Sequence, residues 1–468
     1  MKNFNDDSQE AIINSFVNNS IGRRKHVFNL VKLISNITGN QILAINGAWG
    51  SGKTYFIKQF ELLVNILNNY DENGELINPE LQTNNLACLK NLNDEQISNI
   101  NNVIKNSDYD YRANFMENPT NCLYFNEWEY NNNEEPILSL IYKIINDFPY
   151  LITSCKETKF KTITGLIDIV SNSLSKGGLK VSDYVDAQNL LDDIITSEEI
   201  KSIINEIFNE LLKENSNKLV IVVDELDRCK PTYAIKLLEQ IKHFINNENI
   251  IVILCTNMYQ LSCTIKKQYG YGFSIEEYLD KIIDLTISLP QIIMKEYFQS
   301  IPLESTRQSS NWFSEVLLHY INYRNLEMRS INRYVTMMQF FEKHIYLNMR
   351  KPSKERILFE YVFFPYCVGE QIFNTINYKN FITGKGFEEF YNYINSSEEI
   401  KEIVEHCTHH STKKENRDIK KDMELIYNRI YTNLDINIGD QIRGVSISES
   451  DKKYFFELCT MLSDFTIE

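Results

Sequence analysis

The chain has 468 residues, with 48 Lys and Arg against 63 Asp and Glu, and its formal net charge is −15. Hydrophobic residues make up 43% and charged residues 24% of it, close to the globular average, so wholesale disorder is excluded. The acidic balance excludes an overall basic nucleic-acid binder, and at ~150 residues per domain the length predicts two or three domains, or one elaborated α/β domain.

The cysteines and the apolar runs indicate the compartment. The nine cysteines are odd in number and scattered, with no C-x-x-C pair, which is typical of reduced thiols in a cytoplasmic protein. The N-terminus lacks the basic region and apolar run of a signal peptide, and no run of 18 apolar residues predicts a membrane span. We therefore expect a cytoplasmic protein.

The first third of the chain predicts helices, a buried strand and an insertion. Residues 8–38 fit two short amphipathic helices around the sequence IGRR, and residues 41–46 form an apolar run that ends before a glycine. A helix is expected from Lys53 to about Leu67. Residues 68–120 are polar, Asn-rich and broken by NG and NP pairs, so we interpret them as an insertion with a helical patch near 94–106.

Four further strands follow. They are predicted at 122–126, at 218–225, at 249–257 and within 281–289, and a second, mostly helical insert occupies 135–216. The run KLVIVVDE at 218–225 is apolar for six positions, which suits the centre of a parallel sheet covered on both faces.

After residue 290 the strand signal fades and helical periodicity dominates. We therefore predict an α/β domain over 1–290, with a parallel sheet of about five strands, and a helical region over 291–468. A helix expected near 325–346 would serve as a lid or sensor. The insertion at 68–120 and residues 340–468 are interpreted as partner-binding segments.

A phosphate-binding loop follows the first strand. The sequence GAWGSGKT at 47–54 matches G-x-x-x-x-G-K-[ST], the Walker A pattern, between a strand and a helix. Glycines let the backbone N–H groups converge on one concavity, and a helix N-terminus attracts phosphate oxygens. Lys53 would reach the β- and γ-phosphates of ATP, and the Thr54 hydroxyl would ligate Mg²⁺. The residues expected to contact the nucleotide are Gly47, Trp49, Gly50, Ser51, Gly52, Lys53, Thr54 and Tyr55.

Two adjacent carboxylates end the most apolar strand. Asp224 would hold Mg²⁺ opposite Thr54, and Glu225 would polarise an attacking water. Acidic residues also end strands and cap helices without any metal, but the intact phosphate loop favours the metal site. Asn257, at the end of the next strand, would orient the γ-phosphate or the water, or is simply a turn residue.

The arginines admit two interpretations each. Arg228 would pair with Asp227, the preferred interpretation, or touch a neighbour's nucleotide. Arg329 and Arg333, spaced i, i+4, would form a sensor face toward the γ-phosphate or a solvated basic face. Arg23 and Arg24 could lie near the base or ribose, although a surface position is preferred.

Two other features are interpreted as structural. Trp128 follows a strand and is expected to pack in the core. The sequence HCTHH at 406–410 lacks the second ligand pair that a zinc site needs, so metal binding there is discounted.

Four segments together resemble the KAP family of P-loop NTPases. They are FNEWEY with the EEP that follows it, DELDRC-x-P from Asp224, YLDKI with the LP that follows it, and MR-x-x-x-R from Met328. The matches extend from about 22 to 335. The chain departs from the family pattern in having Glu225 and Asn257 in place of Asp, Met328 in place of Pro, and no membrane helices within 55–217.

The resemblance implies an ATPase of the additional-strand class, related to AAA+ and STAND proteins, in which hydrolysis switches conformation. It implies that Arg329 is the sensor arginine. Bacterial members often lie in mobile defence loci, acting beside effector proteins encoded nearby. The resemblance therefore implies protein partners and a setting in antiviral defence.

The first hypothesis is a Mg²⁺-dependent ATPase that controls the assembly or activation of a multi-protein complex, with Lys53, Glu225, Asn257 and Arg329 in catalytic roles. The second is an ATP-locked scaffold that barely hydrolyses its nucleotide. A DNA translocase is disfavoured because no basic stripe with interleaved aromatics stands out. A small-molecule kinase would need a substrate base, and none is evident. Homo-oligomerisation stays open.

Overall fold

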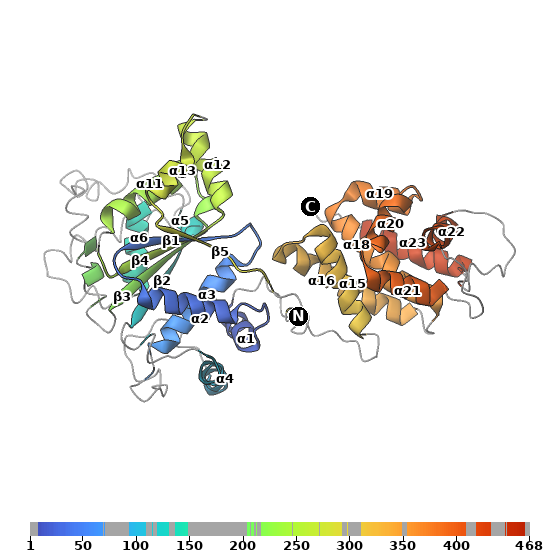
Figure 1. The fold of residues 1–468 in the computed structure, drawn as a ribbon, viewed down its shortest axis with the longest axis horizontal. Helices are drawn as coiled ribbons and strands as arrows, with labels where there is room; N and C mark the ends of the chain where they lie inside the picture. Colours follow the sequence, from blue (N-terminus) through green and yellow to red (C-terminus); the bar gives the residue numbers. More distant parts are fainter. Residues whose placement is uncertain are drawn as a thin grey trace, which may run out of the picture. The chain divides into compact units, whose positions relative to one another are not determined.

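The computed structural model divides the chain into two compact units, which span Asp6–Ser300 and Ile301–Glu468 apart from a few N-terminal residues (Figure 1). The structure describes residues 8–68, 70, 93–108, 115, 119–130, 136–147, 204–205, 207–209, 212, 217–245, 247–270, 272–292, 297, 310–348, 353–408, 418–431, 445 and 447–463.

A five-stranded parallel sheet forms the centre of the N-terminal unit. Its strands are β1 (Gln41–Asn46), β2 (Thr120–Asn126), β3 (Lys218–Asp224), β4 (Ile250–Thr256) and β5 (Leu285–Ser288), in the order β2-β3-β4-β1-β5. All five predicted strands are confirmed. β4 lies between β1 and β3, which is the arrangement expected of the additional-strand class.

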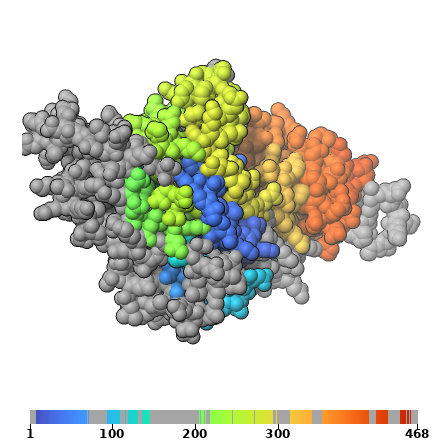
Figure 2. All heavy atoms as spheres, turned by 60° about the vertical axis from the view of Figure 1, so that its left-hand side comes forward, coloured from blue at the N-terminus to red at the C-terminus, as the bar shows by residue number. Residues whose placement is uncertain are grey.

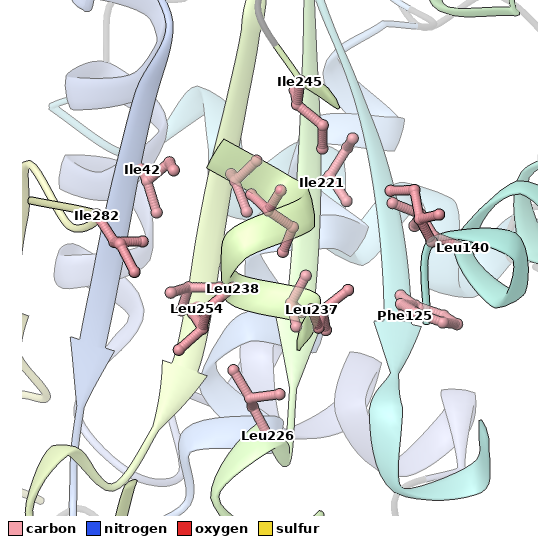
Figure 3. Close-up of a cluster of buried hydrophobic side chains, with 14 of the residues drawn as sticks. Ile42, Phe125, Leu140, Ile221, Leu226, Leu237, Leu238, Ile245, Leu254 and Ile282 are labelled. Atoms are coloured by element: carbon pink, nitrogen blue, oxygen red, sulfur yellow. The ribbon is translucent and has the colours of Figure 1, made fainter. Parts of the chain in front are cut away.

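The two central strands are hydrophobic throughout because helices cover both faces of the sheet. Every residue of β3 and of β4 is buried. One face packs against α6 (Pro136–Asp147) and α11 (Pro231–Phe244), and the other packs against α3 (Lys53–Leu67). In Figure 3, Leu237 and Leu238 of α11 lie over Ile221 and Leu254 of the sheet.

Several helices around the sheet begin where the sequence predicts. α1 (Gln9–Asn18) and α2 (Arg24–Asn36) pack on α3, and α3 has the predicted bounds. α4 (Asp94–Lys105) confirms the helical patch of the insertion, and a capping box of Asn93 and Gln96 fixes its start.

Two short helical segments and two further helices follow the strand ends. They are α5 (Glu127–Tyr130), the 3₁₀ turn η4 (Leu226–Arg228), α12 (Met258–Tyr269) and α13 (Ile275–Asp280). In Figure 2 the residues of α12 and α13, in yellow-green and yellow, gather in one lobe of the N-terminal unit. The rest of the helical insert predicted at 135–216 lies largely outside the described residues.

Within the described residues, the C-terminal unit is mostly helical, as predicted. The expected helix near 325–346 is α16. The elements are α15 (Ser310–Arg324), α16 (Met328–Asn348), α17 (Lys354–Leu358), the π-helical turn η5 (Phe359–Phe363), α18 (Phe364–Phe373), α19 (Thr375–Ile382), α20 (Phe387–Asn395), α21 (Glu398–Thr408), α22 (Ile419–Tyr431) and α23 (Glu449–Ser463).

A buried ion pair joins α15 to α18 in this unit. The Glu370 side chain is fully buried and pairs with Arg324, while the Tyr320 hydroxyl donates to Glu370 Oε1 at 3.0 Å. Gly369 lets the helices approach, because a Cβ there would lie 2.0 Å from the Tyr320 ring. None of the helices that the structure describes is long and apolar enough to cross a membrane.

Candidate functional site

The phosphate loop curls at the carboxyl end of β1 because its glycines accept conformations and contacts that other residues do not. Gly50 and Gly52 have φ of 80° and 86°. A Cβ on Gly47 would lie 2.7 Å from Ser51 Oγ, so only glycine leaves the concavity open. The Lys53 ammonium lies in this concavity and donates to the carbonyls of Gly47 and Ala48, at 2.7 and 3.1 Å. The loop therefore has the shape and the charge of a phosphate cradle.

The loop also contains an unsatisfied buried group. Ser51 Oγ is buried and has no hydrogen-bond partner among the described residues. Because an unpaired buried hydroxyl is costly, an incoming phosphate oxygen would complete its bonding. This observation fits a bound nucleotide.

Thr54 and Asp224 meet across the sheet edge, from α3 and β3. Thr54 Oγ1 donates to Asp224 Oδ2 at 2.6 Å, and the Tyr124 hydroxyl donates to the same oxygen at 2.9 Å. The backbone N–H of Glu225 donates to Asp224 Oδ1 at 2.8 Å. A hydroxyl and a carboxylate oxygen side by side are ligands that Mg²⁺ prefers, so these residues fit the predicted metal.

Burial perturbs the charges at this edge. It raises the pKa of Asp224, against the lowering effect of its hydrogen bonds with Thr54 and Tyr124. Burial lowers the pKa of Lys53, against the attraction of Asp227 and Asp224. Both side chains lose hydration in the fold. An anion beside Lys53 and a cation beside Asp224 would therefore stabilise their charged forms.

Glu225 adopts a left-handed backbone conformation directly after β3, with φ of 63°. Its carboxylate pairs with the guanidinium of Arg228, 2.5 Å from Nη1 to Oε1. The preferred pairing of Arg228 with Asp227 is therefore wrong. The η4 turn explains the difference, because it places residues three apart on the same side.

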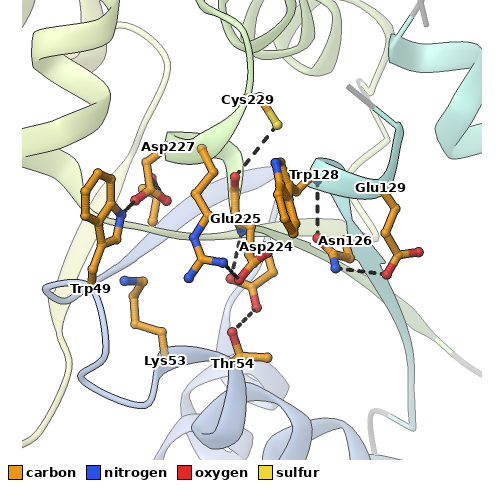
Figure 4. A network of polar contacts seen from close by, with 12 residues as sticks. Trp49, Lys53, Thr54, Asn126, Trp128, Glu129, Asp224, Glu225, Asp227 and Cys229 are labelled. Carbon is orange, nitrogen blue, oxygen red and sulfur yellow. Dashed lines mark hydrogen bonds and ion pairs between the residues drawn. The ribbon is translucent and has the colours of Figure 1, made fainter. Parts of the chain in front are cut away.

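Asp227 instead connects the phosphate loop to β4. The Trp49 indole N–H donates to Asp227 Oδ2 (Figure 4). Thr256 Oγ1 donates to Asp227 Oδ1 at 3.2 Å. Sequence reasoning did not single out Thr256, nor Tyr124, although both belong to the strands that end at the site. The alternation of side chains along β2 and their distance from the strand end could have indicated Tyr124.

Asn257 begins α12. Its side-chain oxygen accepts from the backbone N–H of Gln260 at 3.2 Å, as an N-cap does. Asn257 thus lies at the carboxyl end of β4, as expected, and its side chain caps the helix that follows.

Arg23 is buried against the phosphate loop, so the preferred surface position is wrong for this residue. Only 3% of it is exposed, and Nη1 donates to the Ser51 carbonyl at 2.9 Å. Burial lowers the pKa of Arg23 to about 10. A single arginine carries no periodic signal, so the sequence could not place it. Arg24 donates to the carbonyls of Phe16 and Val17 at the end of α1.

Trp128 is not a core residue. It is 53% exposed, and Figure 4 shows Trp128 and Trp49 on opposite sides of Asp224 and Glu225. The buried residue at this turn is Glu127, which accepts a hydrogen bond from the Tyr233 hydroxyl at 2.6 Å. The turn after β2 therefore directs Glu127 inward and Trp128 toward solvent.

Three further predicted residues belong to α3 and α16. The Tyr55 hydroxyl donates to the Ala11 carbonyl of α1 at 2.7 Å, so its side chain points away from the loop. Arg329 and Arg333 are both exposed on α16, in the C-terminal unit. Among the described residues no group of three or more His, Cys, Asp or Glu side chains could hold a metal ion, and His409 and His410 lie outside the described residues.

A parallel sheet with β4 between β1 and β3, a glycine-rich loop after β1 and a carboxylate at the end of β3 define a P-loop NTPase, a nucleotide-binding protein. The model of the KAP family P-loop domain matches residues 23–345. The chain belongs to the KAP family of P-loop NTPases. A search among curated proteins found no match to the chain.

Proposed function

We propose that this protein is a Mg²⁺-dependent ATPase that uses hydrolysis as a conformational switch in a multi-protein complex. The observation that carries the proposal is the meeting of Thr54 and Asp224 at 2.6 Å, beside the Lys53 ammonium in the phosphate loop. The residues proposed as metal ligands and as the phosphate-binding cation thus belong to α3 and β3.

Each residue would have a separate role in binding or hydrolysing ATP. Lys53 would leave the Gly47 and Ala48 carbonyls and bind the phosphates, while Ser51 Oγ would gain a partner. Thr54 and Asp224 would hold Mg²⁺, which supplies charge neutralisation of the phosphates when bound. Glu225 would accept the proton of an attacking water, and Thr256 or Asn257 would orient that water.

A second function has one observation in its favour. Because Glu225 is paired with Arg228, its carboxylate is engaged, which suits an ATP-locked scaffold that hydrolyses slowly. The two functions differ in turnover and share the nucleotide site. Both proposed functions include partner proteins encoded nearby, a setting in antiviral defence and self-association.

Lys53→Ala tests the nucleotide site. It should abolish ATP binding, because the loop loses its buried ammonium. Isothermal titration with ATP and Mg²⁺ measures the loss, and Lys32→Ala, at an exposed position of α2, is the control. Unchanged affinity in Lys53→Ala would refute the proposed site.

Glu225→Gln tests the hydrolysis. The variant should bind ATP and turn it over at least ~100-fold more slowly, since a neutral amide cannot accept the proton. Phosphate release from the purified protein, alone and with the proteins encoded beside it, provides the measurement. If the variant hydrolyses ATP as fast as the wild type, Glu225 has no part in the mechanism. If the wild type binds ATP and leaves it unhydrolysed, the scaffold function is favoured.

A further inference from the structure

The ion pair of Glu225 and Arg228 joins the proposed base to a cation at the edge of the site. The two residues lie in one tight turn, where the Arg228 N–H also donates to the Glu225 carbonyl at 3.0 Å. The Glu225 side chain is 15% exposed and the Arg228 side chain 31% exposed, so solvent screens the pair only in part. The turn holds the carboxylate close to the guanidinium.

Arg228 also lies close to the phosphate-binding lysine. Its partner Glu225 donates its backbone N–H to Asp224 Oδ1 at 2.8 Å, and Asp224 Oδ2 accepts at 2.6 Å from Thr54, the residue next to Lys53. Two cations at one site repel until an anion binds near them. The terminal phosphate of a nucleoside triphosphate is such an anion, and a guanidinium can bind it through two parallel hydrogen bonds.

We infer that Arg228 is a phosphate-sensing residue that exchanges its partner, from Glu225 in the nucleotide-free protein to the terminal phosphate of bound ATP. The exchange would release the Glu225 carboxylate at the moment when the phosphate is in place. ADP, which lacks that phosphate, would leave the pair intact. This inference rests on the proposed function and assigns its regulation to one side chain.

The competition between the two partners predicts how variants bind. Arg228→Met should weaken ATP binding about tenfold and leave ADP binding nearly unchanged, because the lost bonds involve only the terminal phosphate. Glu225→Gln should tighten ATP binding severalfold, since it frees Arg228 from its carboxylate partner. In the double variant this tightening should disappear, because the released residue is absent.

The experiment is a double-mutant cycle on the full chain, with ATP and ADP affinities measured by titration in the presence of Mg²⁺. Arg228→Lys should recover part of the ATP preference, and Lys267→Met, at an exposed position of α12, is the control for lost charge. Thermal melting shows whether each variant is folded. If one of these variants does not fold, the double variant that carries both Arg228→Lys and Glu225→Gln takes the place of that variant in the cycle.

The experiment distinguishes a failure of the proposed function from a failure of the inference about Arg228. If the wild type binds neither nucleotide, the proposed function fails. If the wild type prefers ATP and Arg228→Met keeps that preference, or if Glu225→Gln tightens ATP equally in both backgrounds, Arg228 is no sensor and the nucleotide site stands.

Discussion

Glu127 is the most completely buried carboxyl near the candidate site. It is 0% exposed, and burial raises its pKa well above 4.5, although the hydrogen bond from Tyr233 lowers it in part. A carboxyl with a raised folded-state pKa stabilises the protein fully below the unfolded pKa. That stability is lost as the pH rises through the folded pKa.

Glu127→Gln should therefore make the protein more stable relative to the wild type at neutral and higher pH. An amide keeps the bond from Tyr233 and has no charge to bury. Between the unfolded and folded pKa values, the advantage should grow by about 1.4 kcal/mol per pH unit. Urea unfolding at several pH values measures it. Glu129→Gln, at an exposed position two residues further on, should leave the slope unchanged, and equal slopes for wild type and Glu127→Gln would contradict the prediction.

The residues that sequence reasoning misplaced share a physical cause. The turn after β3 sets the partner of Arg228, and the turn after β2 sets the exposure of Trp128 and the burial of Glu127. None of these has a periodic signature. The phosphate loop is different, because its glycines, lysine and threonine are each required by the chemistry of the cradle. Spacing alone therefore predicted Lys53, Thr54 and Asp224 as neighbours, and the structure brings them together. Their functional roles remain predictions.

Among the elements, the strands were the most predictable. Burial on both faces of the sheet gives β3 and β4 continuous apolar runs. The starts of two helices could also be predicted, because a proline is the first residue of one, at Pro231, and the phosphate loop precedes the other, at Lys53. The pairing of helices in the C-terminal unit was not readable, because it depends on close approaches such as the one at Gly369.

Gly369→Ala should destabilise the C-terminal unit by at least about 2 kcal/mol. The new methyl group would lie 2.0 Å from the Tyr320 ring, so α15 and α18 must separate and the ion pair of Arg324 and Glu370 must stretch. Thermal unfolding followed by circular dichroism measures the effect. Gly272→Ala, where nothing lies within 4 Å of the added carbon, should be nearly neutral. Equal melting of the two variants would show that the helices can part at no cost.

The charge of the entire chain bears on its partners. A net charge of −15 repels the phosphate backbone of nucleic acids, so proteins are the expected partners. Fluorescence anisotropy with labelled single-stranded and duplex DNA should show no binding near physiological salt. Binding that weakens steeply between about 50 and 200 mM salt would instead favour the translocase hypothesis.

The strand order has a consequence for the newly synthesised chain. In the sheet that the described residues form, β2 is paired with β3, and β1 is paired with β4 and β5, so β2 has no neighbour until the chain reaches Lys218 and β1 has none until it reaches Ile250. The apolar faces of β2 and β1 therefore stay unpaired during the synthesis of roughly 90 and roughly 200 residues, at about 5–20 residues per second. Parallel pairing over such distances is slow and leaves strand edges open to aggregation. We expect this protein to need chaperones more than a helical protein of its length does, and to be produced in better yield when translation and growth temperature are lowered.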